Sequence, residues 1–417
     1  MAVTTVVSFQ ARRAARALRP AEADDRSIKI RVGIAWGLVF LNVLTFYKGT
    51  WNQQPLIIPI PSAIGQLMTQ GALPAALLLA WSVNRRLLIR PNVFLTLLTL
   101  LFIEALIAAI NPNGHIIGTL YRTVRFGEFI AVLWLLSPLA DRRDLLFARC
   151  HLKALGVVLG SVLLGFLLSP SRALAEGRLS GEFWPITPVQ VADYAAVALG
   201  LLVVLWFCGE LSGRKTLPAV VLTGIMLLLT HTRTEVIALM AGLLVAGLSM
   251  FTVRARVRRL FASIAITVSI AATAFSSVLT TWLARGENSE QLTNLTGRTN
   301  VWGAVVNTPR DWYQMLFGFG LSNKGSNGLP IDSNWLAAYY DLGLVGVAII
   351  AAFLLFVLVS AYFQPRSERR ALALFLVTYL LVTSYTETGL SDASMYLLEL
   401  ALAASLLVPR AQDRSLL

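Results

Sequence analysis

The sequence predicts an all-α polytopic membrane protein with about 12 transmembrane helices. Of its 417 residues, 56% are hydrophobic and only 14% are charged, and a soluble domain of this length could not bury so much apolar surface. Apolar runs of about 15–22 residues recur along the chain, which is the length that a helix needs to cross a bilayer. Short basic clusters separate these runs, as in membrane proteins with alternating topology.

Twelve apolar runs are candidate spans. The second and fourth of them are short, and the segment 51–70 carries Pro55, Pro59 and Pro61. Since each proline removes a backbone donor, we expect this segment to be re-entrant or interfacial rather than helical. The predicted spans are roughly 31–48, 70–84, 93–110, 126–140, 150–169, 188–208, 216–231, 235–252, 260–281, 335–362, 371–388 and 392–409.

The basic residues predict the orientation. The formal charge of +13 would suit a nucleic-acid partner, but one alternating set of connections holds 24 of the 35 Lys and Arg residues. Placing that set in the cytoplasm puts both termini inside with an even number of spans. The sequence therefore predicts contact with membrane lipids and no nucleic-acid partner.

The chain divides into an arm and one domain. Residues 1–30 form a basic cytoplasmic arm without a cleavable signal, either flexible or an amphipathic helix on anionic lipid. Residues 31–417 form a single transmembrane domain. Cys150 and Cys208 imply neither a disulfide framework nor a metal site, and the three histidines show no ligand spacing, so no metal or cofactor is expected.

One outer connection is long, at about residues 282–334. Loops of that length are usually functional or disordered. This one contains Trp302, Trp312, Phe317 and Phe319, so we expect it to fold and to cover a cavity at the outer face.

The positive-inside rule leaves the outer arginines unexplained. Arg233 has only about three residues between two spans, and an arginine near hydrocarbon costs roughly 2.5–3.5 kcal/mol. It either pairs with Glu235 or reaches the headgroups, or it belongs to an anion site between helices. The outer arginines are Arg122, Arg125, Arg172, Arg178, Arg233, Arg285, Arg298 and Arg310.

Arg298 begins a short predicted helix that ends before Pro309. Free backbone N–H groups at a helix start, together with a guanidinium, suit a phosphate; an ordinary surface helix is the alternative. Arg178 is either a second phosphate ligand or a loop cation paired with Glu176 or Glu182. Several arginines at one cavity favour a lipid-linked phosphate over a bare sugar.

Arg122 and Arg125 are secondary candidates. They are three residues apart and can share a helix face, but Glu128 on that face could neutralise them.

Five segments resemble the O-antigen ligase and O-antigen polymerase superfamily. They are RLSG from residue 178, THTRTEVIAL from residue 230, TGRTNVW from residue 296, FGFGLSN from residue 317 and DSNWLAAYYDLGLVG from residue 332. The resemblance implies a glycosyltransferase of the bacterial inner membrane, with both termini in the cytoplasm and its active site facing outward. It implies a lipid-linked oligosaccharide donor on undecaprenyl pyrophosphate and a glycolipid or glycan acceptor, with inversion and without metal.

By the same resemblance Arg178, Arg233 and Arg298 hold the leaving pyrophosphate. The chain departs from the family pattern where ligases commonly carry a histidine, since Asp332 stands there, and EFWPITPVQ follows RLSG in place of a His-Pro-Asn-like segment. These departures leave another acceptor, a polymerase or a divergent branch open.

Asp332 is the predicted catalytic base. A carboxylate within about 3 Å of the acceptor hydroxyl can take its proton, although Asp332 or Ser333 could simply cap the tenth span. Glu182 is a second candidate base.

Two other function classes compete with the enzyme. A transporter or flippase of lipid-linked glycans would need charged residues along a path through the membrane, and the spans carry few, mainly Glu104, Asp193, Glu387 and Glu399. Of these, Asp193 and Glu387 could lie near the outer cavity. A non-catalytic scaffold would leave the outer arginines without a purpose.

Overall fold

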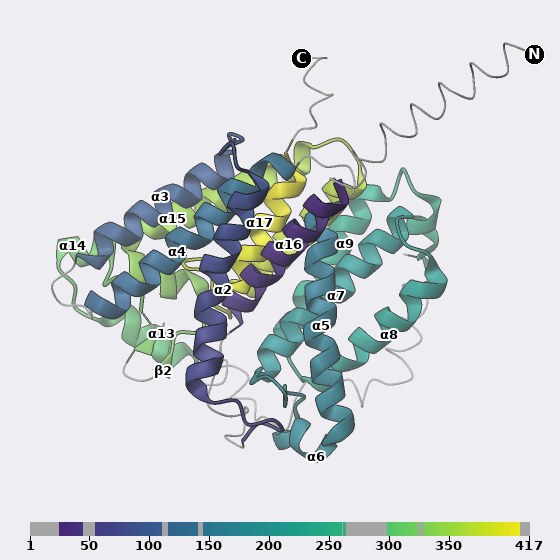
Figure 1. Cartoon of the computed structure of the whole chain (residues 1–417), viewed down its shortest axis with the longest axis horizontal. Coiled ribbons are helices and arrows are strands. Elements are labelled where there is room, and N and C mark those ends of the chain that lie inside the picture. Colours follow the sequence, from purple (N-terminus) through teal and green to yellow (C-terminus); the bar gives the residue numbers. More distant parts are fainter. Residues whose placement is uncertain are drawn as a thin grey trace, which may run out of the picture.

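The computed structural model describes residues 25–44, 55–110, 116–140, 145–260, 262–263, 298–322, 325–326 and 329–408, and these are mainly helical (Figure 1). The long helices are residues 25–43, α2 (Ser62–Val83), α3 (Val93–Ala109), α4 (Ile116–Leu136), α5 (Leu146–Leu168), α7 (Pro188–Cys208), α8 (Gly213–Leu229), α9 (Arg233–Met250), α15 (Asn334–Phe363), α16 (Glu368–Thr383) and α17 (Met395–Leu406). The shorter elements are two 3-10 turns (Ser137–Leu139 and Ala175–Gly177), α6 (Pro170–Ala173), α13 (Arg298–Asn307), α14 (Trp312–Phe317), and the antiparallel pair β1 (Gly325–Ser326) and β2 (Leu329–Pro330).

Several of these helices can cross a membrane. Five in the described part of the chain are long and apolar enough, namely α2, α5, α7, α9 and α15. Shorter apolar helices are α3, Thr216–Leu229 of α8, and α17. Eleven of the predicted spans overlap a described helix, and the ninth, residues 260–281, falls almost wholly outside the described residues. The all-helical class is confirmed, and the count of 12 spans stays a prediction.

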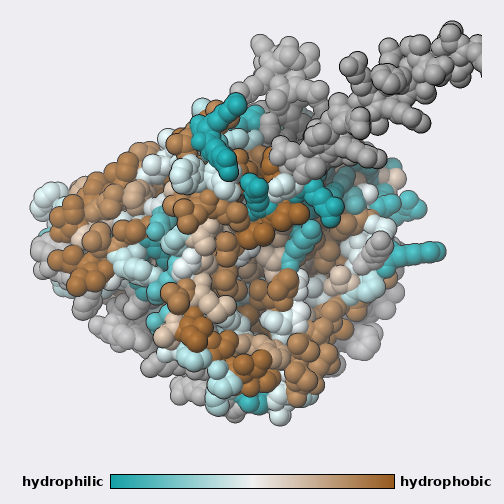
Figure 2. Space-filling view, in the orientation of Figure 1, coloured by the Kyte–Doolittle hydropathy of each residue, from teal (hydrophilic) through white to brown (hydrophobic). Residues whose placement is uncertain are grey.

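The outer surface of the bundle is apolar. Large side chains such as Ile117 and Val157 are 87% and 73% exposed, and Figure 2 shows hydrophobic residues over much of the visible face, with hydrophilic ones concentrated toward its upper edge. Lipid would cover such a surface, whereas water would not. The chain is therefore a membrane protein.

α16 lies at the centre of the packing, against α7, α9, α15 and α17. Its Phe375 fills the space above Gly200 of α7 and Gly242 of α9; a Cβ at Gly200 would overlap the Phe375 ring. Small residues at such positions let helices approach closely within a membrane, where packing rather than the hydrophobic effect holds helices together. Phe375 thus sets the spacing of the three helices that end near the candidate site.

The described connections lie at two ends of the helix bundle (Figure 1). At the end assigned to the cytoplasm, Arg369 Nη2 donates to the carbonyl oxygens of Ala140 (2.8 Å) and Ser405 (3.0 Å). At the other end, the backbone N–H of Leu179 donates to the carbonyl of Leu229 (2.9 Å). In Figure 1, α6, α13 and β2 lie at this second end, toward the bottom of the view.

Two predicted boundaries were wrong. α2 begins at Ser62, inside the segment expected to be non-helical, because Pro61 precedes the first turn, where a missing N–H costs no helical hydrogen bond. α4 begins at Ile116, so Arg122 and Arg125 lie within a helix and not in an outer connection. The hydropathy pattern excludes the first turns of α4 from the span because they carry arginines. The fold accepts these residues within the helix because Arg125 finds its acceptors on a neighbouring helix.

α15 is broken at Gly343, where φ is 63°. The break changes the backbone hydrogen bonding before it, and the carbonyls of Tyr340 and Asp341 accept from the N–H groups of Phe319 (3.0 Å) and Gly320 (2.8 Å). The Gly-rich turn after α14 is thereby fixed to α15. Ser322 adds a bond from its hydroxyl to Asp341 Oδ1 (2.7 Å).

Candidate active site

The site is centred on Arg298, the first residue of α13. Its Nε lies 3.3 Å from Oδ2 of Asp332, just before α15, and its Nη2 lies 3.8 Å from Oε1 of Glu387, between α16 and α17. The predicted short helix is confirmed, since α13 ends at Asn307 before Pro309. One guanidinium thus joins three segments that are distant in the sequence.

Asp332 lies beside the helix cap rather than serving as one. Ser333 is the N-cap residue of α15, and its side chain makes no capping hydrogen bond. The Asp332 carboxylate instead accepts from Arg298, and its side chain is 38% exposed. The side chain predicted to be a base is therefore open to solvent and held by an arginine.

Arg178 is held against the turn between α8 and α9. Its Nε donates to the carbonyl of Thr230 (2.9 Å), and its Nη2 donates to the hydroxyl of Thr232 (3.2 Å). Its positive charge reaches Glu387 and lowers the pKa of that carboxyl. Arg178 consequently belongs to the same electrostatic neighbourhood as Arg298.

Arg233 is the first residue of α9. The hydroxyl of the next residue, Thr234, accepts a hydrogen bond from the hydroxyl of Thr386 (3.2 Å), which precedes Glu387. The carboxylate of Glu235, the predicted alternative partner of Arg233, accepts from the hydroxyls of Tyr379 and Tyr396 (3.5 Å for the latter). The first turn of α9 is thus tied to the segment that carries Glu387.

Glu387 is the residue whose role the sequence did not reveal. The predicted eleventh span ran to residue 388, but α16 ends at Thr383, so Glu387 lies in the connection of residues 384–394. Burial raises its pKa from the ordinary value of 4.5 to about 8; Arg298 opposes the rise, Asp332 and Asp193 add to it, and Arg178 opposes it. A carboxyl group of this pKa exchanges protons near neutral pH.

Asn334 holds this connection in place. Its Oδ1 accepts from the backbone N–H groups of Gly389 (3.2 Å) and Leu390 (2.8 Å), and its own N–H donates to the carbonyl of Ser384 (3.0 Å). Trp335 donates from its indole N–H to the Ser384 hydroxyl (3.2 Å). The start of α15 therefore positions both carboxylates around Arg298.

Arg125, a secondary candidate, has other partners. Its Nε donates to Asn42 Oδ1 (3.0 Å), and its Nη2 donates to the carbonyls of Asn42 (2.8 Å) and Ala393 (3.3 Å). It therefore joins the last turn of the first described helix to the α16–α17 connection. Arg122 lies three residues before Arg125 on α4.

Glu182, the second candidate base, pairs with Arg172 and not with Arg178. Arg172 Nε lies 3.3 Å from Glu182 Oε2, and another nitrogen of the same guanidinium donates to the carbonyl of Pro55. Burial raises the pKa of Glu182, and Arg172 opposes the rise. Since the backbone of Ile57 also bonds to Glu182 (3.1 Å), this pair fastens the segment before α2.

Arg310 is enclosed by aromatic rings. Its guanidinium carbon lies 4.1 Å from the ring centre of Tyr339, 5.2 Å from that of Phe319 and 5.5 Å from that of Tyr340. Its Nη1 donates to the carbonyl of Tyr339 (3.0 Å). This cation–π arrangement fixes α13 and α14 on α15. Arg285 lies outside the described residues.

Three buried acids lie behind the site. Asp193 of α7 accepts from the Tyr379 hydroxyl (2.8 Å), which also bonds to Glu235. Glu399 of α17 is fully buried, and within the described part of the chain neither of its carboxylate oxygens has a hydrogen-bond partner. Nevertheless, no group of three or more His, Cys, Asp or Glu side chains in the described ranges has the geometry to hold a metal ion.

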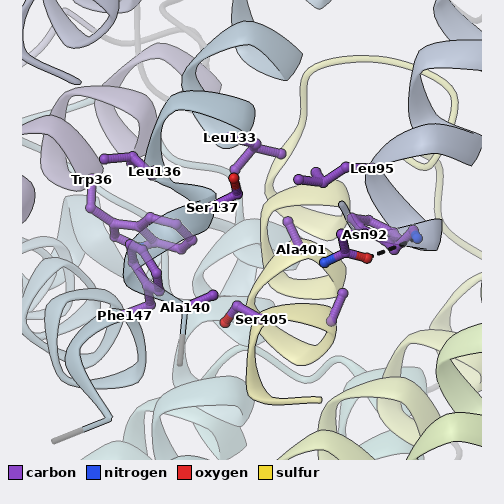
Figure 3. Close-up of a pocket in the computed structure, with 12 residues that line it drawn as sticks. Trp36, Asn92, Leu95, Leu133, Leu136, Ser137, Ala140, Phe147, Ala401 and Ser405 are labelled. Atoms are coloured by element: carbon purple, nitrogen blue, oxygen red, sulfur yellow. Dashed lines mark hydrogen bonds between the residues drawn. The ribbon is translucent and has the colours of Figure 1, made fainter. Parts of the chain in front are cut away.

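A separate pocket lies at the other end of the bundle, between Trp36, Phe147 and α17 (Figure 3). Its polar groups serve the helices around it. Asn92 accepts from the backbone of Phe94 as the cap of α3, and Ser137 donates to the carbonyl of a preceding residue. None of the predicted site residues lines this pocket, so we assign it no part in the site.

The family model described as O-antigen ligase matches residues 218–351, from α8 into α15. These residues are similar to O-antigen ligases, and we call them the ligase-like region. The chain matches no curated protein. The resemblance to the O-antigen ligase and polymerase superfamily is thereby confirmed, and the match supports an enzyme of that type.

The ligase-like region contains only part of the site. Arg233, Arg298 and Asp332 lie within it, whereas Arg178 and Glu387 lie on either side of it in the sequence. Arg178 reaches this region through its hydrogen bond to the carbonyl of Thr230, and Glu387 reaches it through its contact with Arg298.

Proposed function

We propose that the protein is a membrane glycosyltransferase that moves a glycan from an undecaprenyl pyrophosphate carrier to a glycolipid or glycan acceptor. The reaction takes place at the outer face of the bacterial inner membrane, with both termini in the cytoplasm. The observation that carries the proposal is the guanidinium of Arg298, which lies in the ligase-like region and contacts the carboxylates of Asp332 and Glu387.

The chemistry is a displacement at the anomeric carbon. The acceptor hydroxyl oxygen attacks C1 of the first sugar while the bond from C1 to the pyrophosphate oxygen breaks. The pyrophosphate leaves with the electron pair, and the acceptor proton passes to a carboxylate. Attack from the side opposite the leaving group inverts C1.

The arginines stabilise the leaving group. Guanidinium groups bind phosphate oxygens in a bidentate manner, and fixed positive charges aimed at a developing negative charge lower the barrier. Arg298 is the central ligand of this proposal. Arg178, which bonds to the turn between α8 and α9, and Arg233, the first residue of α9, are its further ligands. We propose that these three charges do the work that a divalent cation does in other glycosyltransferases.

The proton acceptor is one of the two carboxylates on Arg298. Asp332 was expected from the sequence, but Glu387 has a pKa of about 8, and a base works best when its pKa is near the operating pH. Its side chain is also less exposed, at 15% against 38% for Asp332. We therefore assign the proton to Glu387 and give Asp332 the role of orienting Arg298.

The test uses purified protein in liposomes with an undecaprenyl pyrophosphate oligosaccharide and candidate acceptors. Glycan size is followed by gel. A ladder identifies a polymerase, and a single shift onto an acceptor lipid identifies a ligase. Arg298→Ala is expected to abolish either product.

Arg256→Ala is the matched control. Arg256 is an arginine at the opposite end of the bundle, where its Nη1 donates to the carbonyl of Trp206 (2.8 Å). Its loss should leave transfer intact. Equal activity in wild type and Arg298→Ala would contradict the proposal.

A transporter or flippase of lipid-linked glycans is the second candidate. The buried carboxylates of Asp193, Glu235 and Glu399 favour it, because acids inside a membrane often serve proton-coupled movement. Movement of the donor across the bilayer, without transfer to any acceptor, would establish transport in place of transferase activity.

A further inference from the structure

An aromatic pair lies directly beside the ionic centre of the site. Trp302 of α13 and Tyr385 of the α16–α17 connection meet edge to face, with ring centres 5.4 Å apart and planes at 80°. Trp302 is four residues after Arg298 and so shares its helix face. Tyr385 is two residues before Glu387. The two rings therefore extend from the same two segments whose charged side chains meet.

The ring of Tyr385 is exposed, and the indole N–H of Trp302 lacks a hydrogen-bond partner among the described residues. Tyr385 is 57% exposed, although it is a large aromatic residue. The indole N–H of Trp302 is shielded from water, yet it has no hydrogen-bond partner among the residues that the structure describes. A buried indole N–H normally finds a partner. An acceptor group from a bound molecule would supply it.

We propose that Trp302 and Tyr385 form the subsite for the first sugar of the donor, the one whose C1–O bond breaks. This inference rests on the proposed function, since that sugar must lie between the pyrophosphate ligand and the base. Arg298 and Glu387 are those two groups, and the aromatic pair lies within about one helical turn of both.

The chemistry of the pair fits a pyranose ring. A sugar presents a face of C–H groups, which packs on an aromatic ring, and a rim of oxygen atoms, which accept hydrogen bonds. The Trp302 N–H donates to a sugar hydroxyl or to an N-acetyl carbonyl. A few polar groups within an aromatic surface are the usual means of fixing a ligand's orientation.

The experiment separates the sugar from its carrier. Binding of two probes to purified protein in nanodiscs is measured: undecaprenyl pyrophosphate alone, and the same lipid carrying one N-acetylhexosamine. The dissociation constant of the bare carrier divided by that of the glycosylated carrier reports how much the sugar contributes to binding. We expect Trp302→Ala and Tyr385→Ala each to reduce this ratio by about tenfold while leaving the affinity for the bare carrier unchanged.

Conservative variants distinguish the ring from the N–H. Trp302→Phe keeps a ring but removes the N–H donor, so the ratio of dissociation constants should fall less than in Trp302→Ala. Tyr385→Phe keeps the ring, so the ratio should equal that of wild type. Tyr362→Ala is the control, because Tyr362 is an exposed tyrosine at the end of α15 far along the helix from Asn334.

Three outcomes would overturn the subsite. In one, wild type binds both probes equally. In another, the Ala variants weaken both probes to the same extent. In the third, the Ala variants raise only the KM for the acceptor, which would assign the two rings to acceptor binding. Failure of wild type to bind either probe would instead contradict the proposed function itself, and with it this subsite.

Discussion

The Nε of Arg298 lies 3.3 Å from the carboxylate of Asp332, although 34 residues separate the two in the sequence. The pair connects the start of α13 to the entrance of α15. With Glu387 on its other side, the guanidinium already has two carboxyl groups beside it before any substrate arrives. Under the proposed function, the pyrophosphate of the donor would compete with these carboxyl groups for Arg298.

Arg298→Lys should weaken donor binding although the charge is kept. A lysine offers a compact point charge and cannot form the two parallel bonds of a guanidinium. We expect the KM for the donor to rise about tenfold or more. Initial rates against donor concentration in proteoliposomes measure it, and an unchanged KM would show that the arginine fork is unnecessary.

Glu387→Gln should lower kcat by about 10²–10⁴-fold, the usual contribution of a general base. In wild type, kcat/KM should fall as the pH drops below about 8, because Glu387 takes up a proton there. Asp332→Asn should keep this acidic limb. A Glu387→Gln enzyme that retains both its rate and its pH profile would return the role of base to Asp332.

Glu387 should also make stability depend on pH. Its pKa is raised in the folded protein, so the stabilisation associated with its neutral form is complete below about pH 4.5 and is lost as the pH rises through about 8. Glu387→Gln removes this dependence. The melting temperature of the variant should therefore exceed that of wild type by more at pH 9 than at pH 5, and an equal difference at both would argue against a raised pKa.

Asn334→Ala should loosen the connection of residues 384–394. The N–H groups of Gly389 and Leu390 lose their acceptor, at a cost of about 1–3 kcal/mol for buried donors. Hydrogen exchange at these two residues should accelerate, with a parallel loss of activity. Asn334→Asp keeps an acceptor at this position and should preserve more of the protection than Asn334→Ala does.

Gly343→Ala should destabilise the protein by about 1–3 kcal/mol. Gly343 has a φ of 63°, and a Cβ there would overlap the backbone at Leu316. Gly71→Ala is the matched control, since Gly71 lies inside α2 with open space around it. Thermal unfolding in detergent should show a lower melting temperature for the first variant and an equal or higher one for the second.

The hydrophobic pattern predicted the helices better than their ends. α7 and α15 match their predicted spans closely, because each is a continuous apolar run next to clear polar residues. The start of α4 was missed because Arg125 obtains its acceptors from Asn42, 83 residues earlier. No local rule detects a partner at that distance.

The same reason separates the site residues that could be predicted from those that could not. Arg178, Arg233 and Arg298 stand out as cations on the side where cations are rare. Glu387 does not, because a window of hydropathy absorbs it into the preceding apolar run. Its importance depends on contacts with Arg298 and on burial, which only the folded chain displays.

The contact between Arg298 and Glu387 also has a practical meaning for protein engineering. The match to O-antigen ligases ends at residue 351, whereas Glu387, the acid on the other side of Arg298, lies in the connection of residues 384–394. A chimera that exchanges residues 218–351 alone between two such proteins would join a guanidinium from one parent to a carboxylate from the other. A chimera that keeps this site intact therefore needs its second crossover point after residue 394, and its first before the segment that carries Arg178.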